Sequence, residues 1–276
     1  MNVLITGGTG WFGRHFAKHA EAEYQKVVIY SRDEAKQAAM RAGMPSGRYR
    51  WMIGDIRDQQ RLTRALQGID VVVHAAALKR IEVGAYNPDE MVKTNVYGAM
   101  HLIEAAITAR VRKVVFLSSD KAFQPISPYG QTKALGESLM LNANNLSGAN
   151  GTRFACVRYG NVWGSTGSVV PTWRAQLSTS DFVTVTDPEC TRFFMTVGEA
   201  VKLVDYVIRV MVGGELEIPL LPAYRMGDLV TAMGAKMKVT GLPSHEKRHE
   251  SMREGMSSEH ARRMGVFELR EELAKI

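Results

Sequence analysis

Short apolar runs rich in β-branched residues alternate along the chain with longer stretches in which apolar residues recur at helical spacing. The longer stretches, such as Met91–Arg110, have the pattern of amphipathic helices. The short runs are typical of strands buried on both faces of a parallel sheet, and they are Val3–Thr6, Val27–Tyr30, Val71–His74, Val114–Ser118 and Phe154–Arg158. This alternation predicts an α/β protein with a doubly wound parallel sheet.

The pattern changes after about residue 162. Gly, Ser, Thr and Pro become frequent through Pro188, Gly198–Met211 returns to helical spacing, and the segments from Gly213 onward are short. We therefore expect a main domain over residues 1–165 and about 190–212, with a small substrate-binding region over 166–189 and 213–276. A chain of 276 residues that is 45% hydrophobic can bury a core of this size.

The first predicted strand runs directly into a glycine-rich segment with the spacing G-x-x-G-x-x-G. In this pattern one glycine permits a tight turn, the next lets the backbone approach a pyrophosphate, and the third lets the helix pack closely on the strand. The free N–H groups at the helix N-terminus favour the negative charge. We predict a Rossmann fold whose dinucleotide lies on Gly7, Gly8, Thr9, Gly10, Trp11, Phe12 and Gly13.

Residues after the next strands indicate which dinucleotide binds. Ser31 and Arg32 at the end of the second strand suit a 2′-phosphate, and Lys36 adds a positive charge, so NADP is favoured over NAD. The alternative is that Arg32 is a solvated surface charge. We place Asp55 and Ile56 near the adenine, and we expect the cofactor to pass close to the small residues Ala75, Ala76 and Ala77.

Tyr129 and Lys133 form the pattern Y-x-x-x-K after the fifth predicted strand. On a helix the two side chains share one face. A free tyrosine has a pKa of about 10, and a neighbouring ammonium lowers this pKa by favouring the phenolate. Tyr129 could then take the proton of a substrate hydroxyl while hydride passes to NADP. The alternative, an exposed pair on a surface helix, is disfavoured by the position of the motif.

Together these motifs resemble the extended short-chain dehydrogenase/reductase superfamily. A longer set of segments resembles its soluble, inverting UDP-N-acetylglucosamine 4,6-dehydratases of pseudaminic acid and related polysaccharide pathways. The resemblance extends to about Val201 and is carried by Ser31–Glu34, Ala75–Lys79, Lys93–Val96, Ser119–Ala122, Arg158–Val162 and Thr191–Phe193. It implies an NADP-dependent lyase that oxidises C4 of a nucleotide sugar, removes water across C5 and C6, and returns hydride to C6.

The resemblance also implies roles for single residues. Loss of water requires a base for the C5 proton and an acid for the departing C6 hydroxyl. By resemblance these are Lys121 and Asp120, although a surface ion pair is the structural alternative. Arg192 suits a diphosphate because its guanidinium offers a planar fork of donors. The substrate-binding residues implied in this way are Lys79, Asn161, Ser168, Val169, Arg192 and Glu250.

Two segments depart from the family pattern. Cys190 stands where methionine is usual, and His245 replaces the glycine of a G-E-K-x-H-E segment, which leaves the nucleotide open. His245 and His249 also match the spacing of a zinc-protease motif. The helix that carries such a motif packs an apolar face, whereas residues 245–253 contain only Met252 as an apolar side chain, so we predict no metal site.

Two other functions stay open. One is a nucleotide-sugar 4-epimerase or ketoreductase of the same fold, and the pair Asp120-Lys121 favours a dehydratase over it. The other is a protein that binds NADP as a redox sensor without turnover. The intact Tyr129 and Lys133 argue against a sensor.

The composition of the chain indicates what kind of partner the protein binds. A net charge of +7 suits an anionic partner, and without a nucleic-acid recognition motif we expect a small nucleotide sugar and no nucleic acid. We expect a cytoplasmic protein with no membrane partner, since we see no signal peptide, no apolar run near ~20 residues and only two cysteines. We also expect a homo-oligomer that pairs through Met91–Arg110 and Tyr129–Asn142.

Overall fold

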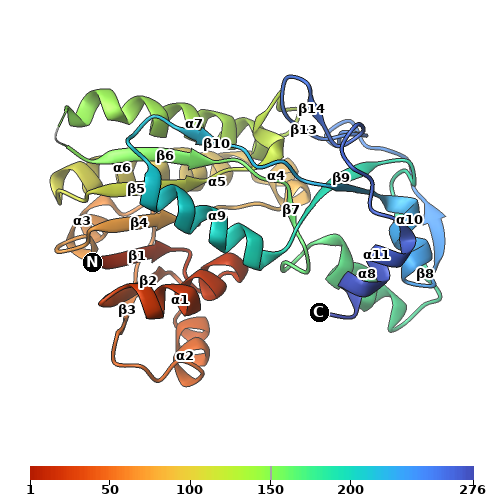
Figure 1. Cartoon of the computed structure of the whole chain (residues 1–276), viewed down its shortest axis with the longest axis horizontal. Coiled ribbons are helices and arrows are strands. Elements are labelled where there is room, and N and C mark those ends of the chain that lie inside the picture. Colours follow the sequence, from red (N-terminus) through yellow and green to blue (C-terminus); the bar gives the residue numbers. More distant parts are fainter. Residues whose placement is uncertain (150) are drawn as a thin grey trace.

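The computed structural model describes residues 1–149 and 151–276. A seven-stranded sheet with the strand order β10-β6-β5-β4-β1-β2-β3 forms its centre, and all neighbouring strands are parallel (Figure 1). The doubly wound parallel sheet predicted from the alternation is therefore confirmed. The strands are β1 (Asn2–Thr6), β2 (Lys26–Ser31), β3 (Tyr49–Ile53), β4 (Val71–His74), β5 (Lys113–Leu117), β6 (Arg153–Val157) and β10 (Leu216–Glu217).

Successive residues of the central strands face two different cores. In β1, Val3 and Ile5 join a core that includes Phe16 of α1 and Val204 of α9, whereas Leu4 joins a core that includes Leu102 of α6. Figure 1 shows α1 and α9 on one face of the sheet and α6 and α7 on the other. The helices of the two faces and their loops are α1 (Trp11–Glu23), α2 (Glu34–Ala42), α3 (Gln59–Ala65), α4 (Ile81–Tyr86), α5 (Pro88–Met91), α6 (Gly98–Thr108), α7 (Pro128–Ser147) and α9 (Val197–Val210).

The single helix predicted over Met91–Arg110 is interrupted. A π-helical segment, η1 (Val92–Tyr97), separates α5 from α6. Within it, Asn95 is buried and its side chain bonds both backbone groups of Leu78, at 2.8 and 2.9 Å. The widened turn thus holds the loop that follows β4, and π-helical turns of this kind often lie at functional sites.

The C-terminal part has its own apolar core, built around Trp163, Trp173, Phe194, Tyr224 and Leu269. In the region that we expected to bind substrate, Leu216–Glu217 instead forms β10 at the edge of the main sheet, because it pairs with Cys156–Val157. The other elements here are β7 (Asn161–Val162), β8 (Phe182–Val185), β9 (Thr191–Met195), β11 (Ala223–Arg225), β12 (Lys236–Val239), β13 (Ser251–Arg253), β14 (Met256–Ser257), α8 (Val169–Leu177), α10 (Met226–Ala232) and α11 (Val266–Leu273).

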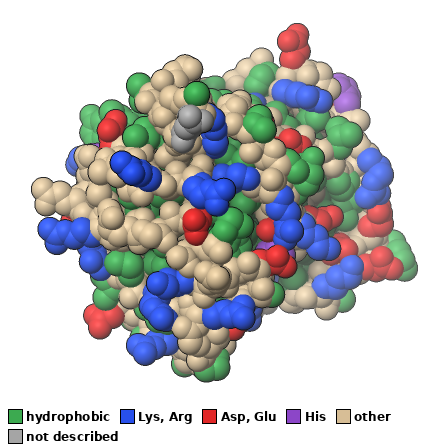
Figure 2. Space-filling view, turned by 60° about the vertical axis from the view of Figure 1, so that its left-hand side comes forward, with side chains coloured by type: hydrophobic (Ala, Val, Ile, Leu, Met, Phe, Trp, Pro, Cys, Tyr) green, Lys and Arg blue, Asp and Glu red, His purple; other side chains and the backbone are tan. Residues whose placement is uncertain are grey.

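On the face shown in Figure 2, Lys and Arg lie among acidic and hydrophobic side chains. Within residues 1–149 and 151–276, no helix combines the length and the apolar character that crossing a membrane requires.

Candidate active site

The glycine-rich turn between β1 and α1 leaves no room for side chains. Gly7 has a φ of +65°, and a Cβ there would lie 2.9 Å from the Cα of Ala76. A Cβ on Gly13 would lie 2.6 Å from both the carbonyl oxygen of Gly7 and the Cα of Gly8. The turn therefore brings bare backbone to the start of α1, which is the shape and polarity that a dinucleotide pyrophosphate requires.

A cavity of about 590 Å³ lies beside this turn. Thr9, Gly10 and Trp11 line it, as does Ala77, as the motif predicts. Its charged lining residues are all basic among the residues described, and they are Arg14, Lys36, Lys79 and Arg80. Sequence reasoning missed Arg14 and Arg80. The position of Arg14, directly after the third glycine and one turn into α1, was the signal that could have revealed it.

The residues predicted to bind the adenine and the 2′-phosphate contact other side chains of the protein. Ser31 is buried and accepts a hydrogen bond from Gln37, whereas Arg32 is 53% exposed and lies 3.8 Å from Asp55. Arg57 holds the Asp55 carboxylate through its Nε at 3.0 Å and its Nη2 at 2.8 Å. Partial burial opposes these bonds, yet they keep the pKa of Asp55 below its usual value. Asp55 is thus already paired, and its contact with adenine stays a prediction, as does that of the buried Ile56.

Tyr129 and Lys133 lie on α7, the helix predicted from their spacing. Ser127 caps its N-terminus by accepting a hydrogen bond from the N–H of Gly130 at 3.2 Å. Lys133 is buried, donates a hydrogen bond to the carbonyl of Leu117, and lies 4.1 Å above the ring of Phe116. Burial lowers the pKa of Lys133 to about 8.

The electrostatics of Tyr129 differ from the expectation. Burial raises the pKa of its phenol, and this outweighs the opposing effects of the Lys121 ammonium and of a hydrogen bond from Ser119. The cation that acts most on the phenol is thus Lys121 rather than Lys133, because Lys133 is turned toward the end of β5. The expectation of a lowered pKa for Tyr129 rests on its spacing from Lys133 and does not include the effect of burial.

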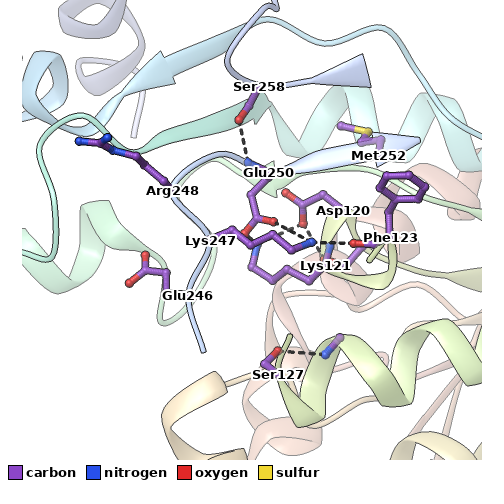
Figure 3. A network of polar contacts seen from close by, with 12 residues as sticks. Asp120, Lys121, Phe123, Ser127, Glu246, Lys247, Arg248, Glu250, Met252 and Ser258 are labelled. Carbon is purple, nitrogen blue, oxygen red and sulfur yellow. Dashed lines mark hydrogen bonds and ion pairs between the residues drawn. The ribbon is translucent and has the colours of Figure 1, made fainter. Parts of the chain in front are cut away.

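Asp120 and Lys121 form a buried ion pair in the short 3₁₀ helix η2 (Asp120–Ala122), directly after β5 (Figure 3). Asp120 is 0% exposed and the side chain of Lys121 is 19% exposed, so the alternative of a surface pair is wrong. The Nζ of Lys121 lies 3.1 Å from Oδ1 of Asp120, 3.2 Å from Oε1 of Glu250 and 3.3 Å from Oδ1 of Asn161. Burial alone would lower the pKa of Lys121, but the two carboxylates raise it well above its usual value.

The segment His245–Glu250 covers this pair. It forms turns and a β-bridge from His249 to Thr191 rather than the helix of a zinc-protease motif. Glu246 pairs with the buried Arg192, and Lys247 donates to the carbonyl of Phe123 at 2.6 Å. The small cavity beneath this segment, about 40 Å³, is lined by Lys121, Arg192 and Glu250 among others.

The structure therefore brings Asn161, Arg192 and Glu250, which are far away in the sequence, to the neighbouring residues Asp120 and Lys121. Other predicted substrate residues lie elsewhere. Lys79 lines the larger cavity, and Val169 begins α8 with Ser168 as its N-cap. The pairing of Arg192 with Glu246 was not foreseen from the sequence.

Known proteins resemble this chain over most of its length. Residues 3–269 match the family model described as polysaccharide biosynthesis protein. The inverting UDP-N-acetylglucosamine 4,6-dehydratase of Campylobacter jejuni is 42% identical over 256 residues, which cover 91% of this chain and 77% of that protein. The UDP-glucose 4-epimerase of Rickettsia prowazekii is 36% identical over 261 residues, covering 91% and 76%.

Among solved structures, Pen from Bacillus thuringiensis superposes with a TM-score of 0.94 at 33% identity, covering 100% of this chain and 98% of that one. The resemblance inferred from the motifs is confirmed by these matches. The chain belongs to the polysaccharide biosynthesis protein family, and within it the chain is similar to the inverting UDP-N-acetylglucosamine 4,6-dehydratases.

Proposed function

We propose that this protein is an NADP-dependent nucleotide-sugar 4,6-dehydratase, a carbon–oxygen lyase that acts on UDP-N-acetylglucosamine. The observation that carries the proposal is the buried Asp120-Lys121 pair beside Tyr129. An epimerase or a ketoreductase needs proton transfer only at the C4 oxygen. A dehydratase needs a second acid and base, and this site supplies an amine and a carboxyl group in contact.

Oxidation at C4 begins the reaction. A bound dinucleotide would supply the acceptor for the C4 hydride and the donor of that hydride to C6. Tyr129 takes the proton of the substrate 4-hydroxyl, and a ketone forms at C4 as that O–H bond and the C4–H bond break. Lys133, which is buried one turn after Tyr129 on α7, would hold the bound cofactor in position beside it.

Elimination follows because the C4 ketone acidifies the C5–H bond. Lys121, as the neutral amine, takes the C5 proton, and the electron pair of that bond forms the C5–C6 double bond. Asp120, as the protonated acid, gives its proton to the C6 hydroxyl, which leaves as water. A hydride at C6 and a proton at C5 complete the product, a 4-keto-6-deoxy sugar. The sum of the steps is loss of one water with no net oxidation.

A direct experiment tests this proposal. The purified protein is incubated with UDP-N-acetylglucosamine and NADP without a reductant, and the product is examined by mass spectrometry and proton NMR. We expect loss of one water, a methyl signal for C6, and no accumulation of NADPH. A product of unchanged mass with inverted C4 would identify an epimerase, and an exocyclic methylene signal would show that elimination stops before hydride reaches C6.

The choice of NADP rests on the basic lining of the large cavity. Arg14 and Lys36 approach it from α1 and α2, and the residues described place no acid on its walls. Ion pairs with a phosphate contribute about 1.5–3 kcal/mol each, so the double variant Arg14→Ala/Lys36→Ala should bind NADP at least about 100-fold more weakly. Affinity for NAD should change little, as measured by isothermal calorimetry.

Arg41 is exposed on α2, the helix that carries Lys36, and it provides a matched control. Arg41→Ala removes a cation that lies outside the cavity. It should leave both affinities unchanged. Equal weakening of NADP and NAD by the double variant would contradict a role in selecting the 2′-phosphate.

We also propose that the protein forms homo-oligomers through the face that carries η1, α6 and α7. Tyr97, Met100 and Leu135 on this face are 51%, 43% and 49% exposed in the single chain. Burial of apolar side chains is the main favourable term in protein association. Light scattering should therefore report at least a dimer, and a monomer at micromolar concentration would contradict this proposal.

A further inference from the structure

We infer that Glu250 is a positioning residue for the elimination: its carboxylate is the counter-ion that makes Lys121 a strong base and stabilises the ammonium formed when Lys121 takes the C5 proton. The inference rests on the proposed dehydratase function. It assigns to Glu250 a role through Lys121, in place of the direct contact with substrate that the family resemblance implied.

The hydrogen bonds of Lys121 show why a second carboxylate matters. An ammonium has three N–H donors, and three oxygens surround this one at 3.1–3.3 Å: from Asp120, Glu250 and Asn161. Asn161 is neutral. Asp120 must carry a proton to act as the acid, and a protonated Asp120 is no longer a counter-ion. Glu250 is then the carboxylate that still faces Lys121.

The surroundings of Glu250 suit a counter-ion. Its side chain is 3% exposed, and its Oε2 has no hydrogen-bond partner among the residues that the structure describes. Its contacts are cations: Lys121 at 3.2 Å and Lys247 at 4.0 Å. Buried in this way, the charge acts on Lys121 with little screening by solvent. A buried aspartate acts similarly on the catalytic histidine of serine proteases, where it stabilises the imidazolium that forms.

The backbone around Glu250 is fixed from two sides. Its N–H donates to the hydroxyl of Ser258 at 2.9 Å, and that hydroxyl in turn contacts Thr191 on β9. Two residues later, the carbonyl of Met252 accepts a hydrogen bond from Arg158. Arg158 also pairs with Glu137 on α7, one turn beyond Lys133. Glu250 is thus held in register with the helix that carries Tyr129 and Lys133.

The proposed electrostatic role of Glu250 predicts the direction in which the pH profile of the activity moves when Glu250 is replaced. Activity that needs the neutral amine rises as pH rises through the pKa of Lys121. Glu250 raises this pKa, so its removal should move the rising limb to lower pH while weakening the base. The groups that face Lys121 are Asp120 on its own element, Tyr129 on α7, Arg192 on β9, Tyr224 on β11, and Lys247 and Glu250.

The test uses the full chain with Glu250→Gln, which keeps the size of the side chain and removes its charge. We expect the rate of dehydration to fall about 100-fold, within the range that acid–base groups contribute. The rising limb should move to lower pH by about 1–2 units, the effect of one adjacent charge. The first burst of NADPH, which reports C4 oxidation, should change less than about threefold because Tyr129 is untouched.

Controls separate the alternatives. Glu254 lies exposed at the turn of the same hairpin, and Glu254→Gln should leave rate and pH profile unchanged. Glu250→Asp restores the charge and should restore the position of the limb. An unshifted limb in Glu250→Gln, or equal loss of burst and dehydration with a lower melting temperature, would overturn the inference. If the unaltered protein forms no dehydrated product, the proposed function fails instead.

Discussion

Replacement of Lys121 by methionine is expected to abolish dehydration while C4 oxidation continues. The thioether has a similar length but cannot accept the C5 proton, so the rate of water loss should fall at least about 1,000-fold. Substrate should still lose its C4 hydride, and NADPH should accumulate to about one equivalent per active site instead of being consumed. Absorbance of NADPH after rapid mixing and mass spectrometry of the product measure the two steps separately.

This change leaves Asp120 and Glu250 buried without their shared cation, which can cost about 3–5 kcal/mol of stability. Melting temperature and the NADPH burst therefore have to be recorded together. A folded variant that retains the burst and loses dehydration supports the assignment of Lys121. Normal turnover by a folded Lys121→Met variant would show that another group removes the C5 proton.

Replacement of Tyr129 by phenylalanine should impair both C4 oxidation and dehydration. It removes one hydroxyl and no charge, so the fold should persist, but proton removal from the 4-hydroxyl loses its base. Both the NADPH burst and dehydration should fall by about 100- to 10,000-fold. In the unaltered protein the burst should become faster as pH rises, because burial holds the pKa of Tyr129 above its usual value and the phenolate forms only at higher pH.

The two variants together separate the oxidation from the elimination. Tyr129→Phe should lack the burst that Lys121→Met retains. If Tyr129→Phe keeps a normal burst, the base for the 4-hydroxyl lies elsewhere in the site.

Features set by local chemistry could be predicted from the sequence. The five predicted strands occur within a residue of their expected bounds, because buried parallel strands need continuous apolar runs. The turn from Gly7 to Gly13 and the helix that carries Tyr129 and Lys133 follow from spacing alone. Asp120 and Lys121 are neighbours in the chain, so their contact needed only the position of the strand end.

Features set by distant packing could not be predicted. Glu250 lies 129 residues after Lys121 and contacts it because β13 packs against η2, and no local sequence pattern predicts that contact. The pairing of Arg192 with Glu246 arises in the same way. The pKa of Tyr129 depends on burial, which spacing does not report, and the π-helical turn at Asn95 depends on a loop 17 residues earlier.

One isotope experiment tests the central claim most directly. UDP-N-acetylglucosamine that carries deuterium at C4 is incubated with the protein and a catalytic amount of NADP, and the product is analysed by mass spectrometry and NMR. If the protein is a 4,6-dehydratase, one water is lost and the deuterium appears in the C6 methyl group. Deuterium that stays at C4, with or without loss of water, would contradict that account.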